Sequence, residues 1–188
     1  EVPVGDDQRQ HIEITRDIAI RFNHRFGDTL VLPKAVHPKA GARVMDLQDP
    51  TSKMSKSAAA DNGLIYMLDD NATIEKKFKR AVTDSDGVVA YDRENKAGIS
   101  NLLDILSAAT GTPIPQLVEQ YSQYGPLKKD TGDAVIAVID PIRSRYNELM
   151  NDKGQLAQLL KIGNQRAREV AARTLDRTHK AIGLLPRI

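Results

Sequence analysis

The sequence predicts an α/β chain: a strand–helix–strand unit of a parallel sheet, followed by an all-α region and a long C-terminal helix. Three observations support this prediction. Two short apolar runs, at residues 1–4 and 30–33, flank a stretch with helical spacing. From about residue 58 onward, almost every segment has helical spacing. Aromatic residues make up only 4% of the chain, so leucine, isoleucine and alanine must fill its core.

The strand–helix–strand unit begins with a short strand that Gly5 ends. Asp6 and Asp7 lie where the helix should begin, and Gly27 lies where it should end. Residues 30–33 form the second strand-like run. This order of elements is the building unit of a parallel α/β sheet.

The helical region begins with a segment at residues 74–82, for which Thr73 is the candidate N-cap. A second helix is predicted at residues 99–110, because Gly111 follows the last apolar position.

Prolines mark the next two predicted helices. Pro113 or Pro115 should begin a helix that ends near Gly125. The following segment, residues 133–150, has helical spacing but contains Pro141, which predicts a kink or a break.

The last predicted element is a long amphipathic helix over residues 155–184. Residues 153–188 carry eight Lys or Arg against two Asp or Glu, a net charge of +6, whereas the rest of the chain carries 19 against 23. A basic segment on a near-neutral body is compatible with a polyanionic partner. On charge alone, a solvated helix face is the simpler explanation.

Composition excludes several classes of protein. There is no cysteine, which excludes disulfides and thiolate metal sites and fits a reducing cytoplasm. No apolar run of about 18 residues is present, so no membrane span is predicted. No secretory leader opens the chain, so we expect a cytoplasmic protein. Glu1 opens a strand-like run without an initiator methionine, so the chain is expected to begin inside a domain.

The most distinctive feature is the pentapeptide Lys53-Met54-Ser55-Lys56-Ser57. Two ammonium groups three residues apart, separated by small hydroxyl residues in a loop, can wrap a polyphosphate. They would supply positive charge to oxygens that become more negative as a leaving group departs. The start of the following helix can add backbone N–H groups. For two lysines in general, an exposed polar loop is the simpler interpretation.

A second feature is the glycine–acid corner, Val2-Pro3-Val4-Gly5-Asp6-Asp7-Gln8. A glycine at the end of a strand lets the backbone approach a ligand closely. A carboxylate at the start of the next helix can accept hydrogen bonds from ribose hydroxyls. Taken alone, Asp6 and Asp7 could equally well only cap the helix and complement its dipole.

These motifs carry a family resemblance. All five residues of the pentapeptide match the signature of class I aminoacyl-tRNA synthetases. The corner, extended through Arg9-Gln10-His11, closely resembles tryptophanyl-tRNA synthetases. The resemblance covers nearly the whole chain, since it continues at Thr15-Arg16-Asp17, Arg21-Phe22-Asn23, Ala81-Val82-Thr83-Asp84-Ser85 and Gly98-Ile99-Ser100-Asn101-Leu102-Leu103.

The resemblance implies an enzyme that uses ATP and Mg²⁺ to convert tryptophan into tryptophanyl-adenylate and then transfers it to tRNA-Trp. Lys53 and Lys56 would be the catalytic residues, because they would stabilise the pyrophosphate leaving group. Asp7 would contact the ribose, and the backbone of Val44 would pack against adenine. The full set of implied ATP-binding residues is Gly5, Asp6, Asp7, Val44, Lys53, Met54, Ser55, Lys56 and Ser57. No metal ligand is assigned, because the four histidines lack metal-ligand spacing.

The resemblance also implies an architecture. Residues 1–57 would be the second half of a Rossmann-like catalytic domain. Residues 58–152 would form a helical domain that serves the anticodon end of tRNA. Residues 153–188 would be a C-terminal helix that packs back on the catalytic domain. The family is homodimeric, with tRNA bridging the subunits.

One expected signature is absent. Class I synthetases carry a His-x-Gly-His or Thr-x-Gly-Asn motif before the lysine loop, and no such motif precedes Lys53. Lys161-Ile162-Gly163-Asn164 resembles the variant but lies inside the last predicted helix, so we reject it. The tryptophan-selecting residues are also expected upstream of Glu1. We therefore expect a fragment that lacks half the active site, is inactive in isolation, and is poorly soluble or partly disordered in its N-terminal third.

Three alternatives stay open. The tyrosine-specific sister enzyme is one, although its glycine corner usually differs from this one. A basic helical module that binds structured RNA without chemistry is another, with Arg166, Arg168, Arg173, Arg177 and Lys180 facing phosphates. A processed form that acts by itself is the third.

Overall fold

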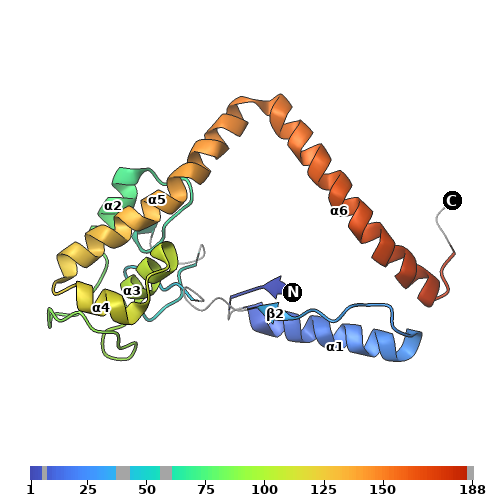
Figure 1. Cartoon of the computed structure of the whole chain (residues 1–188), viewed down its shortest axis with the longest axis horizontal. Coiled ribbons are helices and arrows are strands. Elements are labelled where there is room, and N and C mark those ends of the chain that lie inside the picture. Colours follow the sequence, from blue (N-terminus) through green and yellow to red (C-terminus); the bar gives the residue numbers. More distant parts are fainter. Residues whose placement is uncertain (6–7, 37–42, 56–60, 186–188) are drawn as a thin grey trace. The chain divides into compact units, whose positions relative to one another are not determined.

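The computed structural model describes residues 1–5, 8–36, 43–55 and 61–185 (Figure 1). The chain divides into two compact units. One unit combines residues 1–38 with residues 147–188, and the other comprises residues 39–146. The described part is mostly helical, with one small parallel sheet. An α/β chain dominated by helices was the prediction, and at this level it is confirmed.

The first unit contains the predicted strand–helix–strand order. Strand β1 (Val2–Pro3) and strand β2 (Ala35–Val36) are parallel neighbours, with helix α1 (Arg9–Phe26) between them in the chain. The N–H of Val2 donates to the carbonyl of Lys34 at 2.8 Å, and that of Val4 donates to Val36 at 3.0 Å. Two residues per strand make a marginal sheet by themselves.

The second strand was predicted too early. It begins at Ala35, whereas the prediction placed it at residues 30–33. Asn23 of α1 explains the difference, because its side chain accepts from the N–H of Leu30 at 2.8 Å and donates to the Leu30 carbonyl at 2.7 Å. Backbone groups bonded to this side chain are not available for a ladder. The end of α1 at Gly27 was predicted correctly, and the φ of 81° there suits a residue without Cβ.

Helix α6 (Lys153–Ala181) is the long C-terminal helix that the apolar spacing predicted. The Asp152 carboxylate caps it by accepting from the N–H of Gln155 at 2.9 Å. None of its side chains is buried. Gly163, part of the rejected nucleotide motif, lies in its interior.

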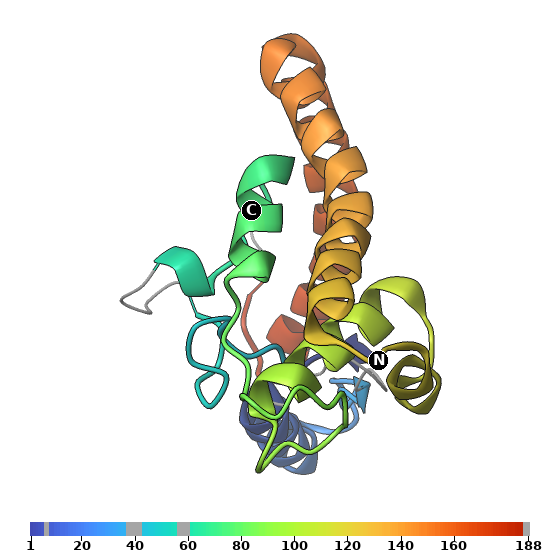
Figure 2. The ribbon, with the colours of Figure 1, turned by 90° about the vertical axis from the view of Figure 1, so that its left-hand side faces the viewer.

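The described part of the second unit is built from four helices. They are α2 (Asn71–Lys79), α3 (Ala97–Thr110), α4 (Ile114–Gln120) and the first part of α5 (Tyr124–Asn151). The short 3-10 turn η2 (Asp61–Gly63) precedes α2. Helix α2 lies alongside α5 in both views (Figures 1 and 2).

Four of the predicted helix limits were wrong, and one of them is the start of α5, which lies at Tyr124 and not at residue 133. The N-cap of α2 is Asp70, whose carboxylate accepts from the N–H of Thr73, and the helix ends at Lys79. Helix α4 ends at Gln120, and Gly125 lies in the first turn of α5. The predicted break at Pro141 is also absent, because α5 continues through it. Pro141 is exposed, so water can satisfy the carbonyl that its missing N–H leaves without a helical partner.

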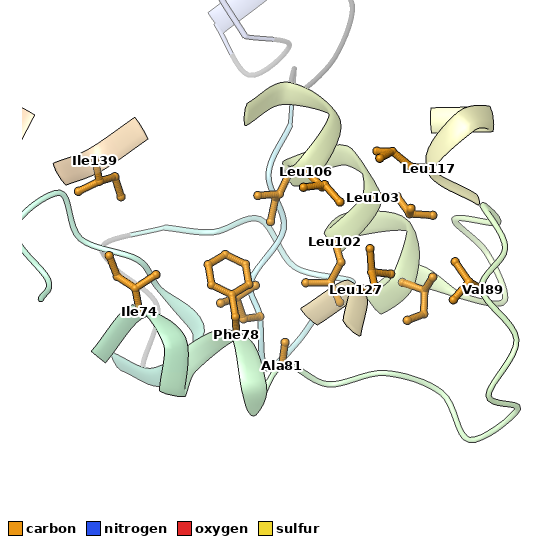
Figure 3. Close-up of a cluster of buried hydrophobic side chains, with 13 residues drawn as sticks. Ile74, Phe78, Ala81, Val89, Leu102, Leu103, Leu106, Leu117, Leu127 and Ile139 are labelled. Atoms are coloured by element: carbon orange, nitrogen blue, oxygen red, sulfur yellow. The ribbon is translucent and has the colours of Figure 1, made fainter. Parts of the chain in front are cut away.

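The core of the second unit joins α2, α3, α4 and α5 (Figure 3). Phe78 of α2 and Leu102 of α3 are each 1% exposed, and Leu127 of α5 is fully buried. A Cβ added at Gly132 would lie 3.5 Å from the Cβ of Phe78, so α5 approaches α2 closely at this glycine. Aliphatic side chains supply most of this core, as the low aromatic content predicted.

A buried ion pair ties α2 to the preceding turn. The ammonium of Lys77 lies 2.8 Å from Asp69 and 5.1 Å from the centre of the Tyr66 ring. The side chains of Lys77 and Asp69 are 7% and 15% exposed. Solvent therefore cannot replace either partner fully.

We expect Lys77→Met to lower the free energy of unfolding by roughly 2–3 kcal/mol, because it leaves the Asp69 carboxylate without its cation in a nearly dry site. Urea unfolding followed by circular dichroism measures the loss. Lys76→Met, one residue earlier on an exposed position, should change stability by less than about 0.5 kcal/mol. Equal losses in both variants would contradict this account.

The start of α3 is fixed by a second polar cluster. The ammonium of Lys96 donates to Asp84 at 3.1 Å and to Asp86 at 3.0 Å, and the Tyr124 hydroxyl donates to Asp84. Burial tends to raise the pKa of Asp84, but the hydrogen bonds from Tyr124 and Lys96 outweigh it and lower the pKa. Asp84 is therefore ionised at neutral pH, and the cluster holds together the start of α3, the preceding loop and the start of α5.

Across the part of the chain that the structure describes, we find no helix with the length and apolar character needed to cross a membrane.

Candidate active site: the lysine loop

Lys53 lies on a two-stranded antiparallel loop formed by residues 44–54. The N–H of Met54 donates to the carbonyl of Val44 at 3.1 Å, and the N–H of Asp46 donates to Ser52 at 2.9 Å. Met45 and Lys53 face each other between these two bonds. The backbone of Lys53 is thus fixed on both sides, while its side chain is exposed. Lys56 and Ser57, the last two residues of the pentapeptide, lie outside the described residues.

Two aspartates shape the turn that connects the strands of this loop. The Asp46 carboxylate accepts from the N–H groups of Gln48 at 2.7 Å and Asp49 at 3.1 Å. The Asp49 carboxylate accepts from the hydroxyls of Ser52 and Thr51, both at 2.6 Å. The hydrogen bond from Ser52, followed by that from Thr51, lowers the pKa of Asp49. Asp49 is therefore ionised at neutral pH, and the turn has the local carboxylate-to-backbone bonds typical of aspartate turns.

The buried Asp46 depends on a glycine. Asp46 is 5% exposed, and a Cβ at Gly63 would lie 1.9 Å from its Oδ1 atom. The carbonyl of Gly63 also accepts from the N–H of Leu47 at 3.0 Å. The η2 turn therefore packs directly on the base of the lysine loop, and only glycine leaves room for the carboxylate.

Helix α3 anchors the loop from another direction. The side-chain amide of Asn101 donates to the carbonyl of Met45 at 2.9 Å and accepts from the N–H of Met45, also at 2.9 Å. Asn101 is 3% exposed. Its neighbours in the helix, Ile99 and Leu102, are core residues. A polar side chain in such a position needs partners, and the loop backbone supplies them.

The strands of the loop separate an apolar side from a polar one. Val44 and Met54 pack against the hydrophobic core and line an open cavity of about 340 Å³ together with Phe78 and Ile105. Met45 lines a smaller cavity of about 150 Å³ with Arg43, Pro50, Arg93, Ser100, Asn101 and Asp104. Met54, the methionine of the pentapeptide, is therefore a packing residue that holds the loop against the helices of the second unit.

The glycine–acid corner belongs to the other compact unit, which combines residues 1–38 with residues 147–188. Gly5 is half-buried at the end of β1, and its carbonyl accepts from the N–H of Gln8 at 3.0 Å. Helix α1 begins immediately afterwards, at Arg9. This is the strand–turn–helix geometry in which a backbone can approach a nucleotide. Asp6 and Asp7 lie outside the described residues.

The structure brings together four of the predicted site residues, namely Val44, Lys53, Met54 and Ser55. It also identifies three residues that sequence reasoning missed: Asp46, Asp49 and Asn101. The signal for Asn101 was present, because an asparagine among apolar helix positions must find a hydrogen-bonding partner.

One unit holds a lysine on a loop fixed by backbone pairing, and the other unit holds a strand–glycine–helix corner; both features are those expected of a class I synthetase. The family model described as tRNA synthetases class I (W and Y) matches residues 1–147, and the chain belongs to this family.

Individual relatives point to the tryptophan branch. The chain is 52% identical to the tryptophan–tRNA ligase of Mycobacterium leprae over 187 residues, which cover 98% of this chain and 54% of that protein. The crystal structure of tryptophanyl-tRNA synthetase from Mycoplasma pneumoniae superposes with a TM-score of 0.86 at 34% identity, over 97% of this chain and 57% of that one.

The Campylobacter jejuni enzyme, crystallised with ADP and tryptophan, has a TM-score of 0.63 at 31% identity, over 97% of this chain and 56% of that one. The chain thus spans about half the length of the relatives it matches.

Proposed function

We propose that the protein containing this chain is a tryptophan–tRNA ligase. It activates tryptophan with ATP to give tryptophanyl-adenylate and pyrophosphate, and it then transfers the tryptophanyl group to tRNA-Trp. The observation that carries the proposal is the lysine loop, in which the Lys53 backbone is fixed and the residue is exposed. The family membership and the names of the relatives support it.

In this proposal, the tryptophan carboxylate attacks the α-phosphorus of ATP. The bond between the α-phosphorus and the oxygen that bridges it to the β-phosphorus then breaks. Negative charge then develops on the departing pyrophosphate. Lys53, with Lys56, stabilises that charge without taking part in covalent bonding. Met54, Ser55 and Ser57 complete the loop around the phosphates.

The remaining site residues bind the adenosine. The backbone of Val44 packs against adenine, Gly5 allows close approach, and Asp6 and Asp7 lie beside the nucleotide, with Asp7 on the ribose. The Campylobacter jejuni relative was crystallised in complex with ADP and tryptophan, which is a precedent for nucleotide binding in this family.

Magnesium would accompany ATP through the phosphate oxygens. The carboxylates nearest to Lys53 in the loop, those of Asp46 and Asp49, already accept hydrogen bonds from backbone and hydroxyl donors. They fit a role in shaping the loop better than a role as metal ligands. Among the described residues, no group of three or more acidic or histidine side chains is arranged to hold a metal ion. The ion supplies charge neutralisation on the phosphates when it is bound.

The proposed architecture follows the family. Residues 1–57 are the second half of a Rossmann-like catalytic domain, residues 58–152 form the helical anticodon-side domain, and residues 153–188 are a helix that returns to the catalytic domain. The enzyme acts as a cytoplasmic homodimer. The 188-residue chain by itself is expected to be inactive, because the described and predicted site residues include none that would bind tryptophan.

Amino-acid-dependent ATP–pyrophosphate exchange tests the proposed function. It should be measured on the full-length protein that carries this chain, with tryptophan and with tyrosine. We expect exchange with tryptophan and none above background with tyrosine. Exchange with tyrosine alone would assign the protein to the sister enzyme, and exchange with neither, from a folded protein, would reject the proposal.

A second candidate function, RNA binding without chemistry, is favoured by one observation. Helix α6 buries none of its side chains, and the five basic residues expected to face phosphates are exposed: Arg166, Arg168, Arg173, Arg177 and Lys180. An exposed cationic helix can contact RNA phosphates. This reading does not account for the fixed lysine loop, so it ranks second.

A further inference from the structure

The side chain of Asn101, on helix α3, lies where it can hold the backbone of the lysine loop in position. It comes from α3, 56 residues away in sequence from Met45, and it bonds to both backbone groups of that residue at 2.9 Å. Met45 is the residue directly opposite Lys53. A chain of direct contacts therefore runs from the buried amide, through one residue, to the backbone of the proposed catalytic lysine.

The loop needs such an anchor, because its own ladder is short. Two backbone hydrogen bonds, Met54 to Val44 and Asp46 to Ser52, flank the Met45–Lys53 pair. An isolated two-stranded ladder of this length is at best marginally stable in water. The bidentate amide fixes Met45 against a buried helix, so it fixes the register of the strand that Lys53 faces.

The helix that carries Asn101 is itself rigidly held. A Cβ at Gly98 would lie 2.2 Å from the carbonyl oxygen of Val82, and the N–H of Val82 donates to the carbonyl of Leu47 at 2.7 Å. Leu47 belongs to the same loop as Met45. Two separate paths, one through Asn101 and one through Val82, therefore lock α3 to the base of the lysine loop.

We propose that Asn101 is a positioning residue for pyrophosphate formation, which acts by holding Met45 and thereby the backbone of Lys53. This inference rests on the proposed function. It predicts that loss of the amide costs activity only through Lys53. If Asn101 has a purely structural role and only satisfies its own hydrogen-bonding groups in the core, its loss lowers stability, and the effect on activity does not depend on Lys53.

The first test is a double-mutant cycle on ATP–pyrophosphate exchange by the full-length protein. Asn101→Leu keeps the approximate volume and removes both hydrogen bonds. We expect it to lower exchange at saturating tryptophan by about 10–100-fold, because small misplacements of a catalytic group are costly. In a Lys53→Ala background, the same substitution should change exchange less than about 2-fold, because the positioned group is gone. Multiplicative losses in the cycle would overturn the proposal.

The matched control is Ser100→Ala. Ser100 is adjacent in α3 and 1% exposed, and its hydroxyl accepts from the N–H of Asp92 at 2.9 Å, in a different loop. This variant should leave exchange within about 2-fold of the wild type. If Asn101→Leu fails to fold, Asn101→Ser takes its place, since it is smaller, stays polar, and is too short to bond both groups of Met45. An unchanged exchange rate in a folded Asn101→Ser protein would overturn the proposal.

Amide hydrogen exchange provides a readout that does not depend on catalysis. We expect the Met54 and Asp46 N–H groups to exchange at least about 10-fold faster in the Asn101 variants and at the wild-type rate in Ser100→Ala. If the wild type shows no ATP–pyrophosphate exchange, the proposed function fails while this experiment still tests the anchor. If protection of Met54 is unchanged in the Asn101 variants, the anchor itself is refuted.

Discussion

Replacing Lys53 and Lys56 together with alanine is expected to lower tryptophan-dependent ATP–pyrophosphate exchange by at least about 10³-fold, because removing even one preorganised charge partner of a developing oxyanion costs about 10²–10³-fold. The loop geometry makes the expectation sharp for Lys53. Its backbone is held by the ladder to Met45, so the loop presents this side chain from a fixed position.

The matched control removes two positive charges at the same spacing. Lys76 and Lys79 are three residues apart on α2 and exposed, so Lys76→Ala with Lys79→Ala changes the net charge equally. We expect exchange within about 3-fold of the wild type, since neither lysine is a residue of the proposed site and salt screens exposed charges. The kinetic constants of the Lys53, Lys56 variant should show a loss mainly in kcat, as expected for an interaction made in the transition state.

The same variant separates the two candidate functions. A tRNA ligase should lose exchange while keeping most of its affinity for tRNA, measured by filter binding at fixed salt. An RNA-binding module should lose affinity for RNA and have no exchange to lose. Loss of both in equal measure would point to misfolding, which circular dichroism would reveal.

Phe78→Ala is expected to cause the largest loss of stability in the helical unit, about 3–5 kcal/mol. The ring is 1% exposed and lies at the centre of the cluster that joins α2, α3 and α5 (Figure 3). It also faces Gly132 at van der Waals distance, so helix α5 cannot easily move in to fill the space. Urea unfolding measures the loss.

A surface valine provides the comparison for this prediction. Val88 is 59% exposed, and Val88→Ala should change the free energy of unfolding by less than about 0.5 kcal/mol. A cost of Phe78→Ala below about 1.5 kcal/mol would mean that the cluster relaxes around the missing ring. Because Phe78 also lines the cavity beside Val44 and Met54, we expect the destabilised protein to lose protection at the Met54 amide as well.

Several features of the fold were predictable because their signals are local. Gly27 and Gly111 end α1 and α3, and both have a positive φ that L side chains rarely adopt. The long helix α6 followed from its spacing of apolar residues. The N-cap of α2 was misassigned to Thr73, because the capping carboxylate of Asp70 lies three residues earlier and competes with the threonine for the same role.

The location of the second strand could not be predicted from its apolar run. Leu30 is the start of that run, but its backbone bonds to Asn23, and the ladder begins only at Ala35. Periodicity shows where apolar residues lie and does not show which backbone groups another side chain has already taken. The continuity of α5 through Pro141 could not be predicted from the sequence either. The cost of the N–H that proline lacks depends on whether solvent reaches the carbonyl left without a helical partner.

The sequence by itself determined the family of this chain, whose model matches residues 1–147, and it predicted the site residues through the lysine pentapeptide and the glycine–acid corner. Tertiary structure alone decided how the lysine is held. The bonds from Asn101 to Met45 span 56 residues, and the room for Asp46 depends on Gly63 in a separate turn. Such contacts arise only when the helices have packed, because a buried amide finds its partner through the fold and not through its neighbours in the chain.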